Sequence, residues 1–436
     1  MLSRAILFSL LILTLVGCAG VPSTPESVVP TPPPSPLQPT ASPTPTRELE
    51  PMIVTIELWL PVELDPYGGG PGAGVLAQQL NEFSRAYPDV QVEVIVKKAR
   101  GRGGLFDFLR TARDAAPSVL PDLVVLDTAD LETAAGSGLI QPLDDLLSPA
   151  EMADRFPFAT DLGTVDGQTF GFVVGAHMEH LAYRVDGQSQ LSALLDSSPL
   201  SWTQIISPPV PFVFPAGGSN QQVNDATLIQ YLAAGGRLID EEGQPRLDED
   251  VMVNVFGFYS DCIRTGTISS TVVLRTRDAD QAWEQFQAGA GQMAVVPADR
   301  FWLEADDTVA AGSIPTESGQ PFSIARGRVV AMVTDDPARQ SLAMLLLDWL
   351  IAPDHNGLWT QASGYLPGTN AALRIWDVSN EDRAALRGVL EAAVPPPRPE
   401  VMAVVGPVLQ DALEAVLRGR ATPEEAAAAA IKTLEE

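Results

Sequence analysis

One short stretch of the sequence, His177-Met178-Glu179-His180, places three side chains that often bind metals within four residues. In an extended strand, residues 177 and 179 point to one face and residue 180 to the other. The three side chains therefore do not converge on a single ion, as a tetrahedral site would require. We expect no metal site here, and we interpret His177 and Glu179 as hydrogen-bonding groups of a ligand-binding site.

The glycine-rich stretch 68–74 and the many acidic residues are the other features that could indicate cofactor binding or catalysis. The glycine-rich stretch 68–74 leads into a predicted helix, whose backbone N–H groups can hold an anion or a ligand oxygen. It lacks both the Gly-Lys-Ser/Thr ending of a P-loop and the G-x-G-x-x-G register of dinucleotide-binding loops. Acidic residues are abundant, but no motif singles out a catalytic pair, a nucleophile or a metal arrangement. We therefore predict no catalytic residues and no cofactor.

The N-terminus has the pattern of an export signal. Arg4 precedes an apolar run over residues 5–16, which is too short for a convincing membrane span. The run ends in Leu-Val-Gly-Cys18, which resembles the lipobox of bacterial lipoproteins, so we expect cleavage after residue 17 and lipidation of Cys18. The alternative is an ordinary signal with an incidental cysteine. The lipidated protein would be extracytoplasmic and anchored to the cell membrane or the outer membrane.

Residues 18–50 form a predicted linker that is rich in Pro, Ser and Thr and has no apolar face to bury. The folded part, residues 52–436, contains a single cysteine, Cys262, which we interpret as a buried thiol. With 27 basic and 55 acidic residues, the chain is a poor partner for nucleic acid, whose phosphates need a basic surface. We expect a monomer.

Hydrophobic periodicity predicts alternating strands and helices. The first half has strands at 53–60, 90–96 and 122–127, separated by helices at 75–86 and 105–116. The runs that are apolar on both faces indicate a parallel sheet covered by helices on both sides. Later in the chain we predict short strands at 212–216 and 293–298, and helices at 225–235, 248–265, 279–288, 337–351 and 402–418. Asp336 and Thr422 are predicted helix N-caps.

The order of these features resembles one family. PDLVVLDTADLETAAGSGLIQPLDDLL, DGQTFGFVVGAHMEHLAYR, GGRLIDEEGQP, AWEQFQAGAGQMAVVP and GYLPGTNAAL follow one another as in the extracellular solute-binding proteins of family 1. These are the carbohydrate-type receptors of ABC importers. The resemblance extends from about residue 52 to residue 436.

The resemblance implies a type II periplasmic-binding-protein-like fold, with two discontinuous α/β lobes joined by hinge strands. We place lobe 1 at about 52–172 and 318–366, and lobe 2 at about 173–317 and 367–436. The implied function is to bind a sugar or similar solute in the cleft, close about the hinge, and dock to permease subunits. A secreted carbohydrate-active hydrolase, or a sensor or adhesin with the same fold, remains an alternative.

A cleft for a sugar needs aromatic platforms and planar hydrogen-bonding side chains. Trp59 and Asp127 end two predicted strands, where open α/β sheets bind ligands. Trp59 is alternatively a core residue, and Asp127 alternatively caps the following helix.

The resemblance adds four further residues. Phe301, Trp302 and Tyr365 align with cleft positions of the family, although each is alternatively packing between the lobes. Arg326 stands where the family usually has a Gly-Gly pair. A cation there would suit an acidic sugar, but a surface arginine paired with an acid is the more favoured interpretation.

Overall fold

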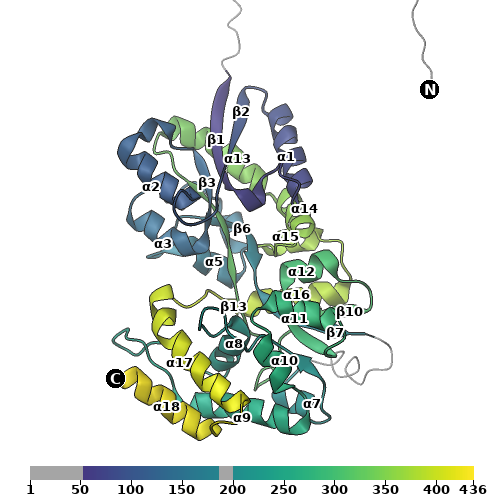
Figure 1. Ribbon diagram of the computed structural model, residues 1–436. Coiled ribbons are helices and arrows are strands. Elements are labelled where there is room, and N and C mark those ends of the chain that lie inside the picture. Colours follow the sequence, from purple (N-terminus) through teal and green to yellow (C-terminus); the bar gives the residue numbers. More distant parts are fainter. Residues whose placement is uncertain (1–52, 186–199) are drawn as a thin grey trace, which may run out of the picture. The chain divides into compact units, whose positions relative to one another are not determined.

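The computed structural model describes residues 53–185 and 200–436, all of them in one compact unit, residues 51–436 (Figure 1). The predicted signal, Cys18 and the linker lie outside the described residues. In the described ranges, no helix combines the length and the apolar character that crossing a membrane requires.

The first sheet has five strands. Their order is β2 (Val90–Lys97), β1 (Val54–Pro61), β3 (Leu123–Asp127), β12 (Arg326–Met332) and β6 (Phe172–His177). β1 runs parallel to β2 and β3, as predicted. β12 is antiparallel to both of its neighbours, so the prediction of a parallel sheet is wrong for this part. The chain re-enters the sheet at β12 from the other half of the molecule, and it therefore runs in the opposite direction.

Alternation along β1 decides which layer each side chain joins. Ile56, Leu58 and Leu60 share a core with α1 (Ala73–Ala86), α13 (Pro337–Ile351) and α14 (Pro353–Ser363). Trp59 points to the other face, where it shares a core with Leu105 of α2 (Leu105–Ala115). α3 (Thr128–Gly136) and α5 (Pro157–Gly163) also contribute to that core. Helices therefore cover both faces of this sheet, as the apolar strands predict.

The second sheet has four strands in the order β10 (Val309–Gly312), β7 (Glu179–Arg184), β9 (Met293–Pro297) and β8 (Phe212–Val213). β7 is antiparallel to β10 and β9, and β8 is parallel to β9. The helices of this half are α7 (Trp202–Ile206), α8 (Asp225–Ala233), α9 (Glu249–Thr265), α10 (Ser270–Arg275), α11 (Ala279–Gln287), α12 (Ala298–Glu304), α17 (Pro399–Leu417) and α18 (Pro423–Glu435).

The chain passes between the two sheets at short connections. β6 and β7 are separated by Met178 alone, and Ala325 alone separates β11 (Ser323–Ile324) from β12. β11 pairs with β13 (Ala393–Val394). After β13 the chain continues into α17. The remaining elements are η1 (Val62–Leu64), η2 (Pro117–Val119), α4 (Pro149–Ala153), β4 (Thr164–Val165), β5 (Gln168–Thr169), α15 (Asn370–Ile375) and α16 (Asn380–Ala392).

The described elements confirm most of the sequence prediction. Asp336 caps α13 by accepting a hydrogen bond from Ala338 N at 2.9 Å, and Thr422 forms a capping box with Glu425 at the start of α18. Cys262 is a free, buried thiol. Each sheet contains strands from distant parts of the sequence. The residues at which one lobe ends and the other begins stay a prediction.

Candidate functional site

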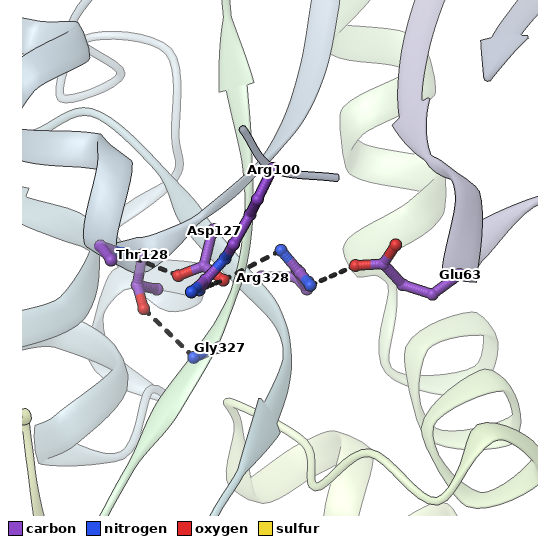
Figure 2. Close-up of polar contacts among 7 residues, drawn as sticks. Glu63, Arg100, Asp127, Thr128, Gly327 and Arg328 are labelled. Atoms are coloured by element: carbon purple, nitrogen blue, oxygen red, sulfur yellow. Dashed lines mark hydrogen bonds and ion pairs between the residues drawn. The ribbon is translucent and has the colours of Figure 1, made fainter. Parts of the chain in front are cut away.

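Charged side chains gather where the carboxyl ends of β1 and β3 meet the first residues of β12. Asp127 ends β3 and lies opposite Arg328 in the β12 register. Glu63 follows β1, and Arg100 follows β2. Figure 2 shows these four side chains converging on one region from separate segments of the chain. The strand ends of an open α/β sheet thus bring together two acids and two arginines.

Arg328 is the centre of this cluster. Its guanidinium donates to Asp127 Oδ2 at 3.1 Å and to the carboxylate of Glu63 (Figure 2). Only 12% of the Arg328 side chain is exposed to solvent, and the side chain of Asp127 is exposed to the same extent. Arg328 therefore links the segment after β1 to the end of β3 through ion pairs with Glu63 and Asp127.

Asp127 is both a helix cap and part of this cluster. Its Oδ1 accepts a hydrogen bond from Ala129 N at 3.0 Å, which caps α3. Its Oδ2 accepts from Arg100 as well as Arg328. Burial alone would raise the pKa of Asp127, but the Ala129 N–H and the two guanidinium groups lower it below its usual value. Asp127 is therefore a carboxylate with fixed partners.

Arg100 reaches Asp127 from a tight glycine-containing loop. Gly101 and Gly103 have positive φ angles of 78° and 73°, which side-chain-bearing residues rarely adopt. A Cβ on Gly104 would lie 2.7 Å from the carbonyl carbon of Arg100. The sequence thus builds a narrow turn that presents Arg100 with 64% of its side chain exposed.

Another ion pair, outside this cluster, joins the first sheet to a helix that belongs to the second sheet's half of the molecule. Arg326, the first residue of β12, binds Asp225 through both terminal nitrogens, one of them at 3.0 Å. Asp225 begins α8. The interpretation of Arg326 as a residue paired with an acid is confirmed, and its partner comes from the other half of the molecule.

Glu179 lies beside this pair at the start of β7. Its Oε2 is buried and has no hydrogen-bond partner among the described residues. Burial and the neighbouring Asp225 raise the pKa of Glu179 well above its ordinary value, while Arg326 acts in the opposite direction. The buried position therefore favours the protonated carboxyl more strongly than water does.

A cavity of about 430 Å³ opens beside these groups. Its lining residues come from both halves of the molecule, the first half being built on the five-stranded sheet and the second on the four-stranded sheet. Arg100, Asp127 and Thr128 line it from the first half, and Arg326 lines it at the crossing. The segment 395–399 and Met402 line it from the second half. Of the sequence-predicted ligand residues, Asp127 and Arg326 line this cavity, and none of its described lining residues is aromatic.

The predicted aromatic platforms lie elsewhere. Trp59 is 3% exposed within the core under α2, with Lys97 Nζ 4.8 Å from its ring centroid. Phe301 is buried, and its ring centroid lies 4.9 Å from that of Trp302. Trp302 in turn packs edge-on against Trp376, with ring centroids 5.6 Å apart. These positions agree with the core and packing alternatives, and they leave ligand contact a prediction.

Tyr365 and His177 form a separate pair at the crossing, with ring centroids 4.1 Å apart. His177 is the last residue of β6, whereas Glu179 begins β7 in the other sheet. The prediction that residues 177–180 belong to one extended strand is therefore wrong, because the chain changes sheets at Met178. Burial lowers the pKa of His177, against an opposing effect of Asp299.

Sequence reasoning missed Glu63, Arg100 and Arg328. Arg328 had a detectable signal, because residues two apart on a strand point to the same face and Arg326 was already a candidate. Glu63 and Arg100 belong to connecting segments, whose positions the periodicity of strands and helices does not predict. No group of three or more His, Cys, Asp or Glu side chains suited to a metal ion occurs in residues 53–185 and 200–436.

Comparisons with known proteins agree with this architecture. A family model described as bacterial extracellular solute-binding protein matches residues 78–385. The curated proteins contain no match to the chain.

Several solved structures are similar to nearly the whole fold. A family 1 extracellular solute-binding protein from Alicyclobacillus acidocaldarius has a TM-score of 0.67 and 15% identity, covering 89% of this chain and 98% of its own. Maltose-bound MalE3 of T. maritima has a TM-score of 0.60 and 22% identity, with coverages of 87% and 99%. A solute-binding protein of Thermotoga lettingae bound with α-D-tagatose has a TM-score of 0.60 and 18% identity, with coverages of 87% and 98%.

These similarities confirm the two-lobe, type II α/β fold expected from the sequence. At these identities they establish the fold alone. The matching family and the similar structures are binding proteins.

Proposed function

Because this chain belongs to the family of bacterial extracellular solute-binding proteins, we propose that it is the lipid-anchored receptor of an ABC importer. It binds a carbohydrate or a similar small solute between its lobes and delivers it to permease subunits. The observation that supports this proposal best is the cavity of about 430 Å³, because its lining residues come from both halves of the chain. Movement of one half relative to the other would therefore change the shape of the site.

The carbohydrate class is supported by the names of similar proteins, which are described as bound to maltose, maltotetraose and tagatose. The cavity also offers directed hydrogen-bonding groups beside apolar residues. Arg100, Asp127 and Thr128 supply the polar groups, and Leu131 and Leu162 belong to the apolar part. A sugar has hydroxyl groups at its edge and an apolar ring face, which suits such a lining.

Hinge closure is supported by the short connections at Met178 and Ala325. Single residues between strands of different sheets are suited to absorb the backbone rotation of a hinge. The ion pair between Arg326 and Asp225 lies beside these connections and joins the two halves. Closure would expel water from the cavity, which strengthens the polar contacts that hold a ligand.

The ligand class is tested by calorimetry on the purified full chain with maltose, maltotetraose, tagatose and uronic acids. At least one sugar should bind, and Asp127→Asn should weaken that binding about tenfold, because it breaks the ion pair that positions Arg100 in the cavity. Asp411→Asn is the matched control, since Asp411 lies exposed on α17 and outside the cavity lining. Hydrolysis of an oligosaccharide by the purified protein would instead support the hydrolase alternative.

The anchor is tested with Cys18→Ser. We expect the variant to lose metabolic labelling by fatty acid and to be released from the membrane fraction or remain unprocessed, because the thiol is the acylated group. A single acyl chain anchors weakly, so the multi-chain lipid of a bacterial lipoprotein is expected. Ligand affinity should stay unchanged. Membrane retention and labelling of Cys18→Ser would contradict the proposed anchor.

The transport role is tested in cells. Deleting the gene for this chain should abolish uptake of the bound solute at low concentration, and loss of the partner permease should have the same effect. Normal uptake combined with a lost transcriptional response to the solute would favour a sensor.

A further inference from the structure

The lining of the cavity between the two halves indicates which kind of sugar it accepts. We propose that the ligand is an acidic sugar, and that Arg100 and Arg398 hold its carboxylate from opposite halves of the molecule. This inference rests on the proposed function and narrows it from carbohydrates in general to those bearing a uronic acid group.

The charges of the lining differ from those of the whole chain. The chain has 27 basic and 55 acidic residues, about one base for every two acids. The cavity is lined by as many basic as acidic residues, and every basic residue in its lining is an arginine. The basic residues are Arg100, Arg326 and Arg398, and the acidic residues are Asp127, Glu132 and Asp161. The cavity is therefore enriched in guanidinium groups, which match a carboxylate in planar, two-point geometry.

Two of these arginines have hydrogen-bond donors to spare. Arg100 contacts Asp127 through Nη2, and the other nitrogens of its largely exposed side chain have no partner among the described residues. A guanidinium has five N–H donors, so most of those of Arg100 are available. The side chain of Arg398 forms no ion pair or hydrogen bond with any residue that the structure describes. Arg326 is different, because Asp225 already occupies both of its terminal nitrogens.

The acids of the lining do not cancel this preference. Both oxygens of Asp127 already accept hydrogen bonds, Oδ1 from Ala129 N and Oδ2 from Arg100 and Arg328, so they face donors of the protein. Glu132 and Asp161 are exposed to solvent, where water weakens their repulsion of a charge several ångströms away. An anion between Arg100 and Arg398 would thus meet two cations with free donors and two screened acids.

Two helices add to this electrostatic preference. α3 begins at Thr128 and α17 begins at Pro399, and both residues line the cavity. The N-terminus of a helix carries a partial positive charge. Asp127 caps α3, but no side chain caps α17, so the first N–H groups of α17 lack a side-chain acceptor among the described residues. The arginines and the two helix starts therefore favour the same sign of ligand charge.

The rest of the lining suits the sugar ring. Since no described lining residue is aromatic, ring stacking does not contribute to binding in this cavity. Apolar atoms from both halves still offer a surface for the C–H face of a pyranose, and they belong to Leu131, Leu162, Val165, Pro395, Pro396, Pro397 and Met402. Charged hydrogen bonds would therefore supply the affinity that ring stacking supplies in sugar-binding sites with aromatic side chains.

The experiment is calorimetric titration of the purified full chain with matched neutral and acidic sugars. The pairs are glucose with glucuronate, galactose with galacturonate, and cellobiose with its uronic acid form. Glucose 6-phosphate tests whether a sugar with a different anionic group binds equally well, and citrate tests whether an acid that is not a sugar binds. We expect at least one uronate to bind tenfold or more tightly than its neutral partner, with an advantage that shrinks as salt concentration rises.

Variants test the assignment of the two arginines. Arg100→Gln and Arg398→Gln should each weaken uronate binding about tenfold and leave the affinity for the neutral partner nearly unchanged. Arg420→Gln is the matched control, because it removes the same charge beyond the other end of α17, about 30 Å away along the helix. Thermal unfolding of all three variants checks that they are folded.

The outcomes test the acidic-sugar inference and the proposed function separately, except where no probe binds. Tighter binding of neutral sugars, or an acid preference that both arginine variants retain, would overturn this inference and leave the carbohydrate receptor intact. Binding of the phosphate but of no uronate would overturn the assignment to a carboxylate. Binding of citrate or another acid that is not a sugar, with no sugar bound, would overturn the carbohydrate class. No binding by any probe would count against both proposals.

Discussion

Arg328 organises the charged cluster at the strand ends because it contacts two acids from different segments. Its side chain is 12% exposed, and it binds both Asp127 and Glu63. Removing one partner of a buried ion pair leaves an uncompensated charge, which costs more than the pair itself contributes. We expect Arg328→Gln to lower the free energy of unfolding by about 3 kcal/mol, measured by denaturant titration.

The matched control for this variant is Arg387→Gln. Arg387 pairs with Glu391 on the surface of α16, with side-chain exposures of 62% and 50%. Such pairs contribute about 0.5 kcal/mol or less, because water screens them. Equal losses in the two variants would mean that Arg328 does not act through buried charge.

Glu179 predicts a pH dependence of stability. Burial and the nearby Asp225 raise the pKa of Glu179 well above its ordinary value of 4.5, with smaller contributions from Asp278 and Asp280, and Arg326 opposes them. The folded state then binds more protons than the unfolded state, so the contribution of Glu179 to stability falls as pH rises above about 4.5.

Glu179→Gln removes this pH-dependent penalty. The variant should gain stability relative to the wild type as pH rises from about 4 to about 7, and the two proteins should converge at lower pH, where the carboxyl is protonated in both states. Urea titrations at a series of pH values measure the difference. Glu435→Gln, an exposed control on α18, should show no such trend. A constant difference between Glu179→Gln and wild type would refute the role of ionisation.

Residue types and the family resemblance together predicted part of the candidate site. Asp127 and Arg326 were predicted and both line the cavity. Asp127 could be recognised because it ends a strand, and Arg326 because it is a cation where the resembled family usually has glycine. The aromatic residues were harder to assign, because Trp59 has the same local sequence whether its ring faces a cleft or α2. Arg398 lines the cavity together with Thr128 and Leu131 of α3, and this neighbourhood depends on tertiary structure that the local sequence does not reveal.

At the scale of elements, the contact between α14 and α12 depends on one glycine. Gly364 ends α14 with φ 77°, and a Cβ there would lie 2.9 Å from Asp299 O and 3.0 Å from Leu303 Cδ1. α12 packs on the second sheet and α14 on the first. We expect Gly364→Ala to strain the backbone and also to separate these helices, with a loss of stability above the roughly 1 kcal/mol of the backbone term.

Gly266 supplies the control for that prediction. It ends α9 in the same left-handed conformation, with φ 83°, but no described atom lies within 4 Å of the position that a Cβ would occupy. Gly266→Ala therefore has the backbone cost without the collision. The difference between the two variants in thermal unfolding measures the helix contact. No difference would show that α12 and α14 adjust freely around the added methyl group.

Local elements were easier to predict than their pairing. The caps at Asp336 and Thr422 depend on neighbouring residues, and both were correct. The direction of β12 was not predictable from its apolar residues, because its partners β3 and β6 lie far earlier in the chain. Strand 212–216 proved to be only two residues long, since its partner β9 pairs with Phe212 and Val213 alone.

At the scale of the whole molecule, the two halves are held together by packing and by charge. Trp302 packs against Trp376 and Gly364 allows α14 to approach α12, so this contact is mainly apolar. The ion pair of Arg326 with Asp225 stands beside the cavity instead. Among the ion pairs of the described residues, it alone joins the first sheet to the helices of the second half. A ligand that draws Arg326 toward itself would therefore compete with a contact between the halves.

Asp225→Asn should loosen the ligand-free protein. The pair is partly exposed, with side-chain exposures of 45% and 18%, so its loss is expected to cost about 1 kcal/mol and to shift the balance of open and closed forms about fivefold. Small-angle scattering should record a larger radius of gyration for the variant than for wild type without ligand.

Saturating ligand should bring the variant and the wild type to the same radius of gyration, because contacts in the filled cavity replace the lost pair. Asp261→Asn is the control, since Asp261 pairs with Arg264 on the same turn of α9 and joins no separate elements. The tail before residue 51 is identical in all three proteins, so differences between them report on the folded part. If Asp225→Asn scatters like wild type without ligand, the ion pair does not influence closure, and packing between α12 and α14 alone sets the resting position of the two halves.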